Sequence, residues 1–322
     1  MARRPIWFVL ALALAATVTA QEGARDDKGA IGILRRDGVL FPFASYDRDT
    51  WEVTWPLTFA DIKLPRSVAD IPAKWWGKGS PEQWRAHLTD GRSMPIELRA
   101  VGAFRPFCID RPGLATNYKS SEALPATPVR PFPKDGIAVS ANTPVDPIES
   151  VDPASPDGRA LAERLLKDFN QVEERTINEL RMNARFRHPI DDEVRRAAPL
   201  KLESWYRAPS GEPGWTVSYI EASRAYPPRP EDKGCGLETF VSGWIHHNRG
   251  QVERSSDIRA RVTYCDRVGV VYMLPFGRIR PRTRDYWIFQ LSGWEAEWYD
   301  VAEVGREKVR HVIEVNAGGC RF

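Results

Sequence analysis

The chain has 322 residues, and its 46 Lys and Arg stand against 43 Asp and Glu, a formal net charge of +3. This near-balance creates no long-range field that would attract a polyanion, so we do not expect a nucleic-acid partner. The length and the hydrophobic content of 42% are sufficient to bury a large core, in one large domain or two ordinary ones.

Residues 1–20 have the three parts of a secretory signal peptide. Arg3 and Arg4 form a basic start, residues 6–16 are almost continuously apolar, and small residues lead up to Ala20. A membrane anchor is the alternative, but this apolar run is shorter than the roughly 20 residues that a bilayer requires. We therefore expect cleavage after Ala20, which leaves 44 basic and 43 acidic residues, no membrane span, and a periplasmic or secreted protein.

Residues 21–124 are predicted to form a β-rich N-terminal region. An Asp-Gly pair at 37–38 separates apolar runs at 31–36 and 39–46, and this pair is typical of a tight β-hairpin because both turn positions take positive φ. The sequence Ser-Pro-Glu-Gln resembles a helix start with a capping box, which predicts a short helix over residues 80–88.

Residues 125–156 contain eight prolines, a density that disfavours both a continuous helix and a central strand. We interpret this segment as a Pro-rich linker or a long surface loop between two halves.

A helical segment is predicted at residues 157–199, with Ser155 as its cap and Pro156 in the first turn. Apolar residues recur along one side at helical spacing, so the helix should lie on a core or a sheet, although an exposed partner-binding helix is the alternative. These residues are Leu161, Leu165, Leu166, Phe169, Val172, Ile177 and Leu180.

Residues 200–322 have the pattern of an antiparallel β domain. Short apolar runs follow one another at intervals of about ten residues, which predicts a β-sandwich or a barrel. The expected strands are 200–207, 215–224, 237–247, 256–264, 268–275, 285–292, 297–304 and 309–315. The predicted fold is therefore mainly β with one long helix, and its N-terminal half is smaller and β-rich.

The four cysteines are Cys108, Cys235, Cys265 and Cys320. In an oxidising compartment an even number favours two disulfide bonds, and the spacing matches no zinc motif. We predict Cys235–Cys265, because both flank strand-like segments of one domain, which leaves Cys108–Cys320 to join the two halves. Buried free thiols are the alternative.

Four arginines recur at every second position in one segment, so extended backbone would place them on one face. Their repulsion requires either acids from a neighbouring strand or an anionic ligand such as a uronate, a phosphate or a carboxylate. A hairpin tip with the side chains in solvent is the alternative. Arg259 and Arg261 would enlarge this candidate ligand-binding site if they lie nearby. The four residues are Arg278, Arg280, Arg282 and Arg284.

Glu295, Glu297 and Asp300 lie beside Trp294 and Trp298. Carboxylates flanked by aromatic rings are what a glycoside hydrolase requires, because one acts as acid and another as base or nucleophile. An ordinary strand with its acids in water and its rings in the core gives the same pattern.

Histidines provide little evidence for a metal site. His246 and His247 are neighbours, and neighbours on a strand point to opposite faces, so they would not chelate one ion together. One of them would form an imidazole site with His311 only if their strands pair. The sequence has no nucleophile elbow, phosphate-binding loop, dinucleotide fingerprint or His-Glu-x-x-His motif, and we expect neither a metal nor a cofactor.

These patterns favour an exported, non-catalytic binding or structural protein of the bacterial periplasm or exterior. The expected partner is an anionic glycan or a component of the cell envelope. The alternatives are a secreted, carboxylate-dependent hydrolase of the glycosidase type, or a domain that packs against a larger partner.

Overall fold

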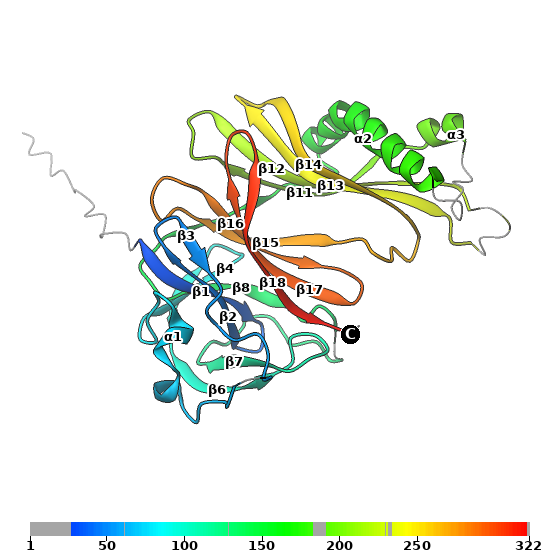
Figure 1. The fold of residues 1–322 in the computed structure, drawn as a ribbon. Coiled ribbons are helices and arrows are strands. Elements are labelled where there is room, and N and C mark those ends of the chain that lie inside the picture. The colour runs from blue at the N-terminus through cyan, green and yellow to red at the C-terminus, as the bar shows by residue number, and fades with distance from the viewer. Residues whose placement is uncertain are drawn as a thin grey trace, which may run out of the picture.

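The computed structural model describes residues 27–60, 62–127, 129–182, 191–228, 230 and 234–320. The signal peptide expected at residues 1–20 lies outside this part of the chain. Antiparallel sheets dominate the fold and one long helix accompanies them, which confirms the predicted fold class (Figure 1).

The N-terminal sheet has the strand order β5-β4-β8-β1-β2-β7-β6, and β3 pairs with β2. Its strands are β1 (Lys28–Arg35), β2 (Val39–Asp47), β3 (Thr50–Glu52), β4 (Trp84–Leu88), β5 (Ser93–Ile96), β6 (Leu98–Phe104), β7 (Arg111–Thr116) and β8 (Lys134–Val139). β1 and β2 form the predicted hairpin, and the turn residue Gly38 has a φ of 81°.

Two predictions for this half are wrong. Residues 84–88 form strand β4 instead of a helix, and Trp84, Ala86 and Leu88 alternate into the core beneath the sheet. The two short helices of this half lie upstream of β4, as η1 (Val68–Asp70) and α1 (Ala73–Trp76).

The interpretation of residues 125–156 as a linker or loop is also wrong for β8, which lies between β4 and β1 within the sheet. The prolines of this segment lie on either side of residues 134–143, which contain none. All backbone N–H groups of β8 are therefore available for strand pairing.

Two further sheets follow, the outer sheet with the order β10-β11-β12-β13-β14 and the central sheet with the order β18-β17-β16-β15-β9. Their strands are β9 (Val145–Asp146), β10 (Glu149–Ser150), β11 (Lys201–Pro209), β12 (Trp215–Ala225), β13 (Leu237–Asn248), β14 (Gln251–Tyr264), β15 (Tyr272–Ile279), β16 (Tyr286–Ser292), β17 (Ala296–Val304) and β18 (Val309–Gly319). Each of the strands predicted after residue 200 is present.

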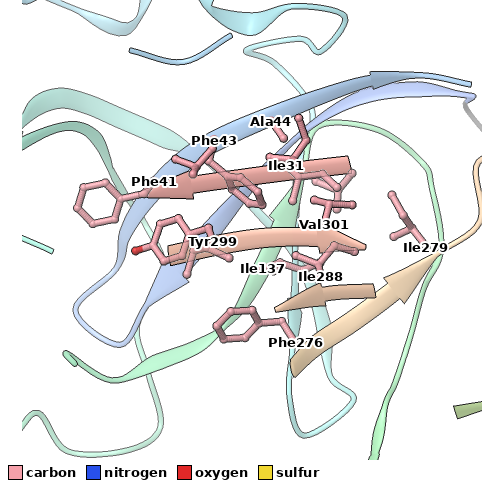
Figure 2. Packing of buried hydrophobic residues seen from close by; sticks show 14 of the residues in the cluster. Ile31, Phe41, Phe43, Ala44, Ile137, Phe276, Ile279, Ile288, Tyr299 and Val301 are labelled. Atoms are coloured by element: carbon pink, nitrogen blue, oxygen red, sulfur yellow. The ribbon is translucent and has the colours of Figure 1, made fainter. Parts of the chain in front are cut away.

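The central sheet is covered on both faces. Toward the N-terminal sheet, Ile288 and Val301 pack against Phe43 and Ile137 in one cluster (Figure 2). Toward the outer sheet, Trp287 and Phe289, the neighbours of Ile288 on β16, point the opposite way and pack against β12 and β13. The N-terminal and C-terminal halves of the chain therefore share a hydrophobic core.

Helix α2 (Pro156–Met182) covers the far face of the outer sheet, and the short α3 (Asp192–Ala197) follows it (Figure 1). Ser155 caps α2 as predicted, since its Oγ accepts a hydrogen bond from the backbone N–H of Gly158 at 3.1 Å. Leu161, Leu165 and Phe169 are buried against the sheet, as the periodicity predicts.

The cysteines form the pairs Cys108–Cys320 and Cys235–Cys265, in agreement with the predicted connectivity. Two disulfide bonds fit a compartment outside the cytoplasm. Within the described part of the chain, no helix is long and apolar enough to cross a bilayer.

Candidate functional site

A cavity of about 440 Å³ lies between the central and outer sheets, and we call it the inter-sheet cavity. Its volume is within the range of small-molecule sites. Its apolar walls include Tyr219, Phe240, Trp244, Phe289, Leu291 and Trp298, and its polar groups include Ser242, Asp257, Arg259, Arg261, His311 and Glu314. Aromatic faces and charges of both signs therefore meet in one place.

Strand alternation brings the charged residues of β14 into this cavity. Asp257, Arg259 and Arg261 line it, whereas Ile258, between two of them, packs in the cluster beneath α2. β14 is the edge strand of the outer sheet, so these side chains lie at one edge of that sheet.

Two β-bulges direct further polar groups to the same place. On β18, Ile313 pairs with Val301 and His311 pairs with Ala302, so one extra residue is inserted between them. His311 and Glu314 consequently face the outer sheet together although they are three positions apart. On β14, the register also shifts, and Asp257 takes a φ of 49°, in the left-handed region.

His311 lies between two carboxylates. Its Nδ1 is 2.7 Å from Asp300 Oδ2, and its Nε2 is 3.7 Å from Asp257 Oδ2. The carboxylates of Asp257 and Asp300 raise the pKa of His311 to about 10, and the contact with His311 lowers the pKa of Asp257. Burial raises the pKa of Asp300. Both carboxylates therefore stabilise the protonated form of this imidazole.

Arg261 differs from its neighbour in having no acidic partner. Arg259 is bound to Asp257 at 3.2 Å, while no acid of the described chain lies within ion-pair distance of Arg261. The guanidinium of Arg261 lies against Gly269, where a Cβ atom would come within 2.4 Å of its Nη2. Gly269 therefore makes room for an exposed, unneutralised cation on the cavity wall.

The arginine segment predicted as a ligand site does not line this cavity. Arg278 and Arg280 converge on the buried carboxylate of Asp285, at 3.3 and 3.0 Å, and Arg278 also contacts Asp146 at 3.2 Å. These contacts join β15 to the start of β16 and to β9.

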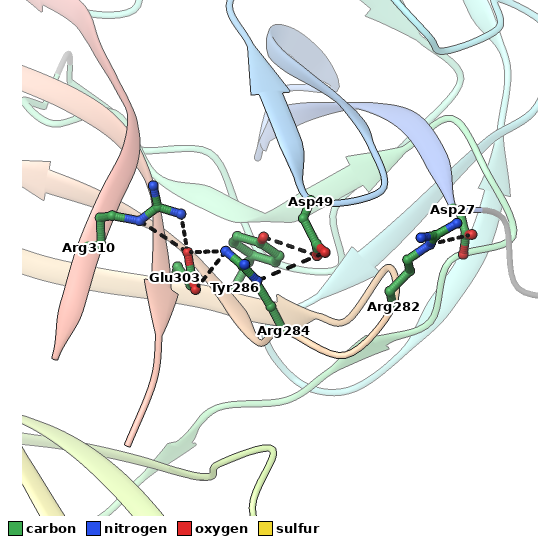
Figure 3. Close-up of polar contacts among 7 residues, drawn as sticks. All are labelled: Asp27, Asp49, Arg282, Arg284, Tyr286, Glu303 and Arg310. Atoms are coloured by element: carbon green, nitrogen blue, oxygen red, sulfur yellow. Dashed lines mark hydrogen bonds and ion pairs between the residues drawn. The ribbon is translucent and has the colours of Figure 1, made fainter. Parts of the chain in front are cut away.

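The other two arginines of the segment contact acids next to the first strands of the N-terminal sheet and an acid on β17 (Figure 3). Arg282 binds Asp27 at 3.2 Å, and Arg284 binds Glu303 at 3.2 Å and lies 3.9 Å from Asp49. The sequence left two ways to offset the repulsion among these arginines, acidic partners or an anionic ligand. The structure contains the acidic partners. An anionic ligand at this segment stays a prediction, and such a ligand would compete with these carboxylates.

Of the three candidate catalytic carboxylates, Glu297 and Asp300 lie on opposite faces of β17. Glu297 faces the N-terminal sheet, where its Oε2 is 2.5 Å from Lys134 Nζ, and both side chains are buried. Asp300 faces the opposite side of β17 and binds His311. Glu295 precedes the strand and is half-buried. Glu297 and Asp300 therefore cannot act on one substrate as an acid and base pair.

The histidine pair and His311 lie in different sheets. His246 Nε2 is 2.8 Å from Ser256 Oγ, and His247 Nε2 is 3.0 Å from Ser218 Oγ, both inside the outer sheet. His311 therefore does not form a metal site with His246 or His247, the arrangement that the sequence left open.

A second cavity, of about 580 Å³, lies between the start of α2 and β11. Its cations include Arg267, which is bound by Glu203 and Glu238. Because these acids satisfy that guanidinium, the larger volume of this cavity does not make it the better ligand site.

Sequence reasoning named Arg259, Arg261, His311 and Asp300 but did not connect them, and it missed Asp257 and Glu314. Alternation alone places His311 and Glu314 on opposite faces, and no local signal marks the bulge that reverses this. No protein-family model matches the chain, and neither the curated proteins nor the solved structures contain a significant match to it.

Proposed function

We propose that the protein is a binding protein that holds a small anionic saccharide in the inter-sheet cavity. In this proposal Arg261 pairs with the acidic group of the ligand, and aromatic side chains such as Trp298 contact its ring. The unpaired guanidinium of Arg261 on an aromatic-lined wall is the observation that carries the proposal. Guanidinium groups bind carboxylates and phosphates through paired hydrogen bonds, and aromatic rings supply apolar contact area.

Binding is favoured over hydrolysis because Glu297 and Asp300 lie on opposite faces of β17. We place the protein in the periplasm or outside the cell, which is supported by its two disulfide bonds and by the signal peptide expected at residues 1–20.

The test compares trigalacturonate with the neutral trisaccharide maltotriose by calorimetric titration. We expect the wild-type protein to prefer trigalacturonate, and Arg261→Gln to weaken that binding by roughly 10- to 150-fold, the value of a hydrogen bond to a charged group. The matched control is Arg282→Gln, which removes an arginine outside the cavity and should leave the affinity unchanged.

Equal affinity for the two sugars, binding of neither, or equal weakening by Arg261→Gln and Arg282→Gln would contradict the proposal. Salt provides a second reading, because added salt should weaken trigalacturonate binding more in the wild type than in Arg261→Gln.

A further inference from the structure

His311 and Glu314 line the inter-sheet cavity, and the buried side chain of Asp300 lies against His311. Each offers one ligand atom, and these atoms all lie within 4.8 Å of one another. Asp300 and Glu314 are direct partners across β17 and β18, and the bulge on β18 brings His311 to the same face. One imidazole and two carboxylates thus come from two adjacent strands, in positions set by backbone pairing.

Two buried atoms of this group lack a hydrogen bond. Asp300 is 0% exposed, and its Oδ2 accepts a hydrogen bond from His311, but its Oδ1 has no partner among the described residues. His311 Nε2 is also buried without a hydrogen-bond partner in that part of the chain. A buried polar atom without a partner costs about 1–3 kcal/mol, so such atoms call for an explanation.

Asp257 approaches the same imidazole from the other sheet. Its Oδ2 is 3.7 Å from His311 Nε2, which is beyond a normal hydrogen bond. Asp257 and Asp300 therefore lie at different ring nitrogens, so Asp257 orients the imidazole from the side away from Asp300.

We propose that Asp300, His311 and Glu314 bind one divalent transition-metal ion, of the Zn²⁺ class, while Asp257 holds the other ring nitrogen of His311. A single imidazole with two carboxylates is a mixed nitrogen and oxygen donor set, which suits Zn²⁺ or Mn²⁺ better than Ca²⁺ or Mg²⁺. Three carboxylates face one imidazole and the guanidinium of Arg259. An ion that binds His311 displaces one proton from it, which leaves two net negative charges for a dication to neutralise. The inference goes beyond saccharide binding and does not depend on it.

The test is a calorimetric titration of the chelator-treated full chain with ZnCl2, and then with MnCl2, without any sugar. We expect one ion per chain, together with an increase in the melting temperature when the ion is present. Glu314→Gln and Asp300→Asn should each weaken binding at least tenfold. Glu314 is exposed, so its substitution tests the site even if Asp300→Asn fails to fold.

Glu307→Gln is the matched control, because Glu307 is an exposed acid in the turn between β17 and β18, away from the cavity. It should leave zinc affinity unchanged. Absence of stoichiometric binding by the wild type, or equal affinity in Glu314→Gln and Glu307→Gln, would overturn the inference. Either result leaves the trigalacturonate measurement unaffected, so the two proposals fail separately.

Discussion

At the scale of single residues, the ion pair between Lys134 and Glu297 connects the N-terminal sheet to the central sheet. Both side chains are at most 1% exposed, and burial lowers the pKa of Lys134 against the opposing effect of Glu297. A buried pair of this kind contributes little net stability compared with apolar residues, but either partner left alone is costly.

We therefore expect Lys134→Met to lower the free energy of unfolding by about 3–5 kcal/mol, because Glu297 then remains buried without a counter-charge. The double variant Lys134→Met/Glu297→Leu should recover most of this loss. Urea unfolding of both variants provides the measurement. A single variant that loses less than about 1 kcal/mol would show that the pair is not isolated from water.

His246 and His247 are buried in the outer sheet, and burial lowers the pKa of each to about 4 from 6.5. Between pH 6.5 and 4 the unfolded chain binds protons that the folded chain does not, so the free energy of unfolding falls as the pH decreases. Each histidine contributes up to about 1.4 kcal/mol per pH unit to this slope.

The variant His246→Gln/His247→Gln should therefore show a flatter dependence of unfolding free energy on pH between 6.5 and 5. His87, whose pKa is also lowered to about 4, remains in both proteins and cancels in the comparison. Denaturant titrations at several pH values measure the two slopes. Equal slopes would mean that the histidines become protonated without unfolding.

At the scale of strands and helices, features specified by local pattern were predictable. Asp-Gly at 37–38 sets the first hairpin, and the apolar spacing of residues 161–177 sets the buried side of α2. The strands after residue 200 follow from short apolar runs between turns, because each run is long enough for a strand and too short for a typical helix.

Features that depend on competing local signals were mispredicted. Ser80 does make the side-chain contact expected of a cap, since its Oγ accepts from the backbone N–H of Glu82 at 3.2 Å, but this contact closes a turn that leads into β4. The alternating pattern of β4 was the stronger signal. For β8, the density of prolines in residues 125–156 was misleading, because none of them lies within the strand itself.

The candidate site was only partly predictable, for a geometric reason. Alternation correctly places Arg259 and Arg261 on one face of β14. The meeting of His311, Glu314 and Asp257 depends on two inserted residues and on the stacking of two sheets, and neither is encoded by a short-range pattern.

At the scale of the whole molecule, the central sheet is the shared layer of two cores. The sequence Tyr-Trp-Ile-Phe of β16 is continuously apolar because its alternate residues enter different clusters, Ile288 toward the N-terminal sheet and Phe289 toward the outer sheet. The predicted domain at 200–322 is therefore incomplete as a folding unit, since one face of its central sheet is covered by the N-terminal half.

We expect the full chain to unfold in one cooperative transition and the fragment 200–320 to have none. In the fragment, Ile288, Val301 and Ile313 lose the side chains that cover them, and burial of such residues supplies about 1.5–3 kcal/mol each. Scanning calorimetry of both proteins, with Cys320→Ser in the fragment, makes the comparison. A soluble fragment with its own sharp transition would show that the halves fold independently.

The two disulfide bonds differ greatly in the length of chain that they span, 212 residues for Cys108–Cys320 and 30 for Cys235–Cys265. During synthesis, the shorter bond has both of its thiols once residue 265 has emerged. Cys108 must instead stay reduced until residue 320 follows, and over that interval it is open to capture by any other thiol, including Cys235. The correct pairing of Cys108 therefore requires the last strand, whereas Cys235 and Cys265 can pair before that strand is made.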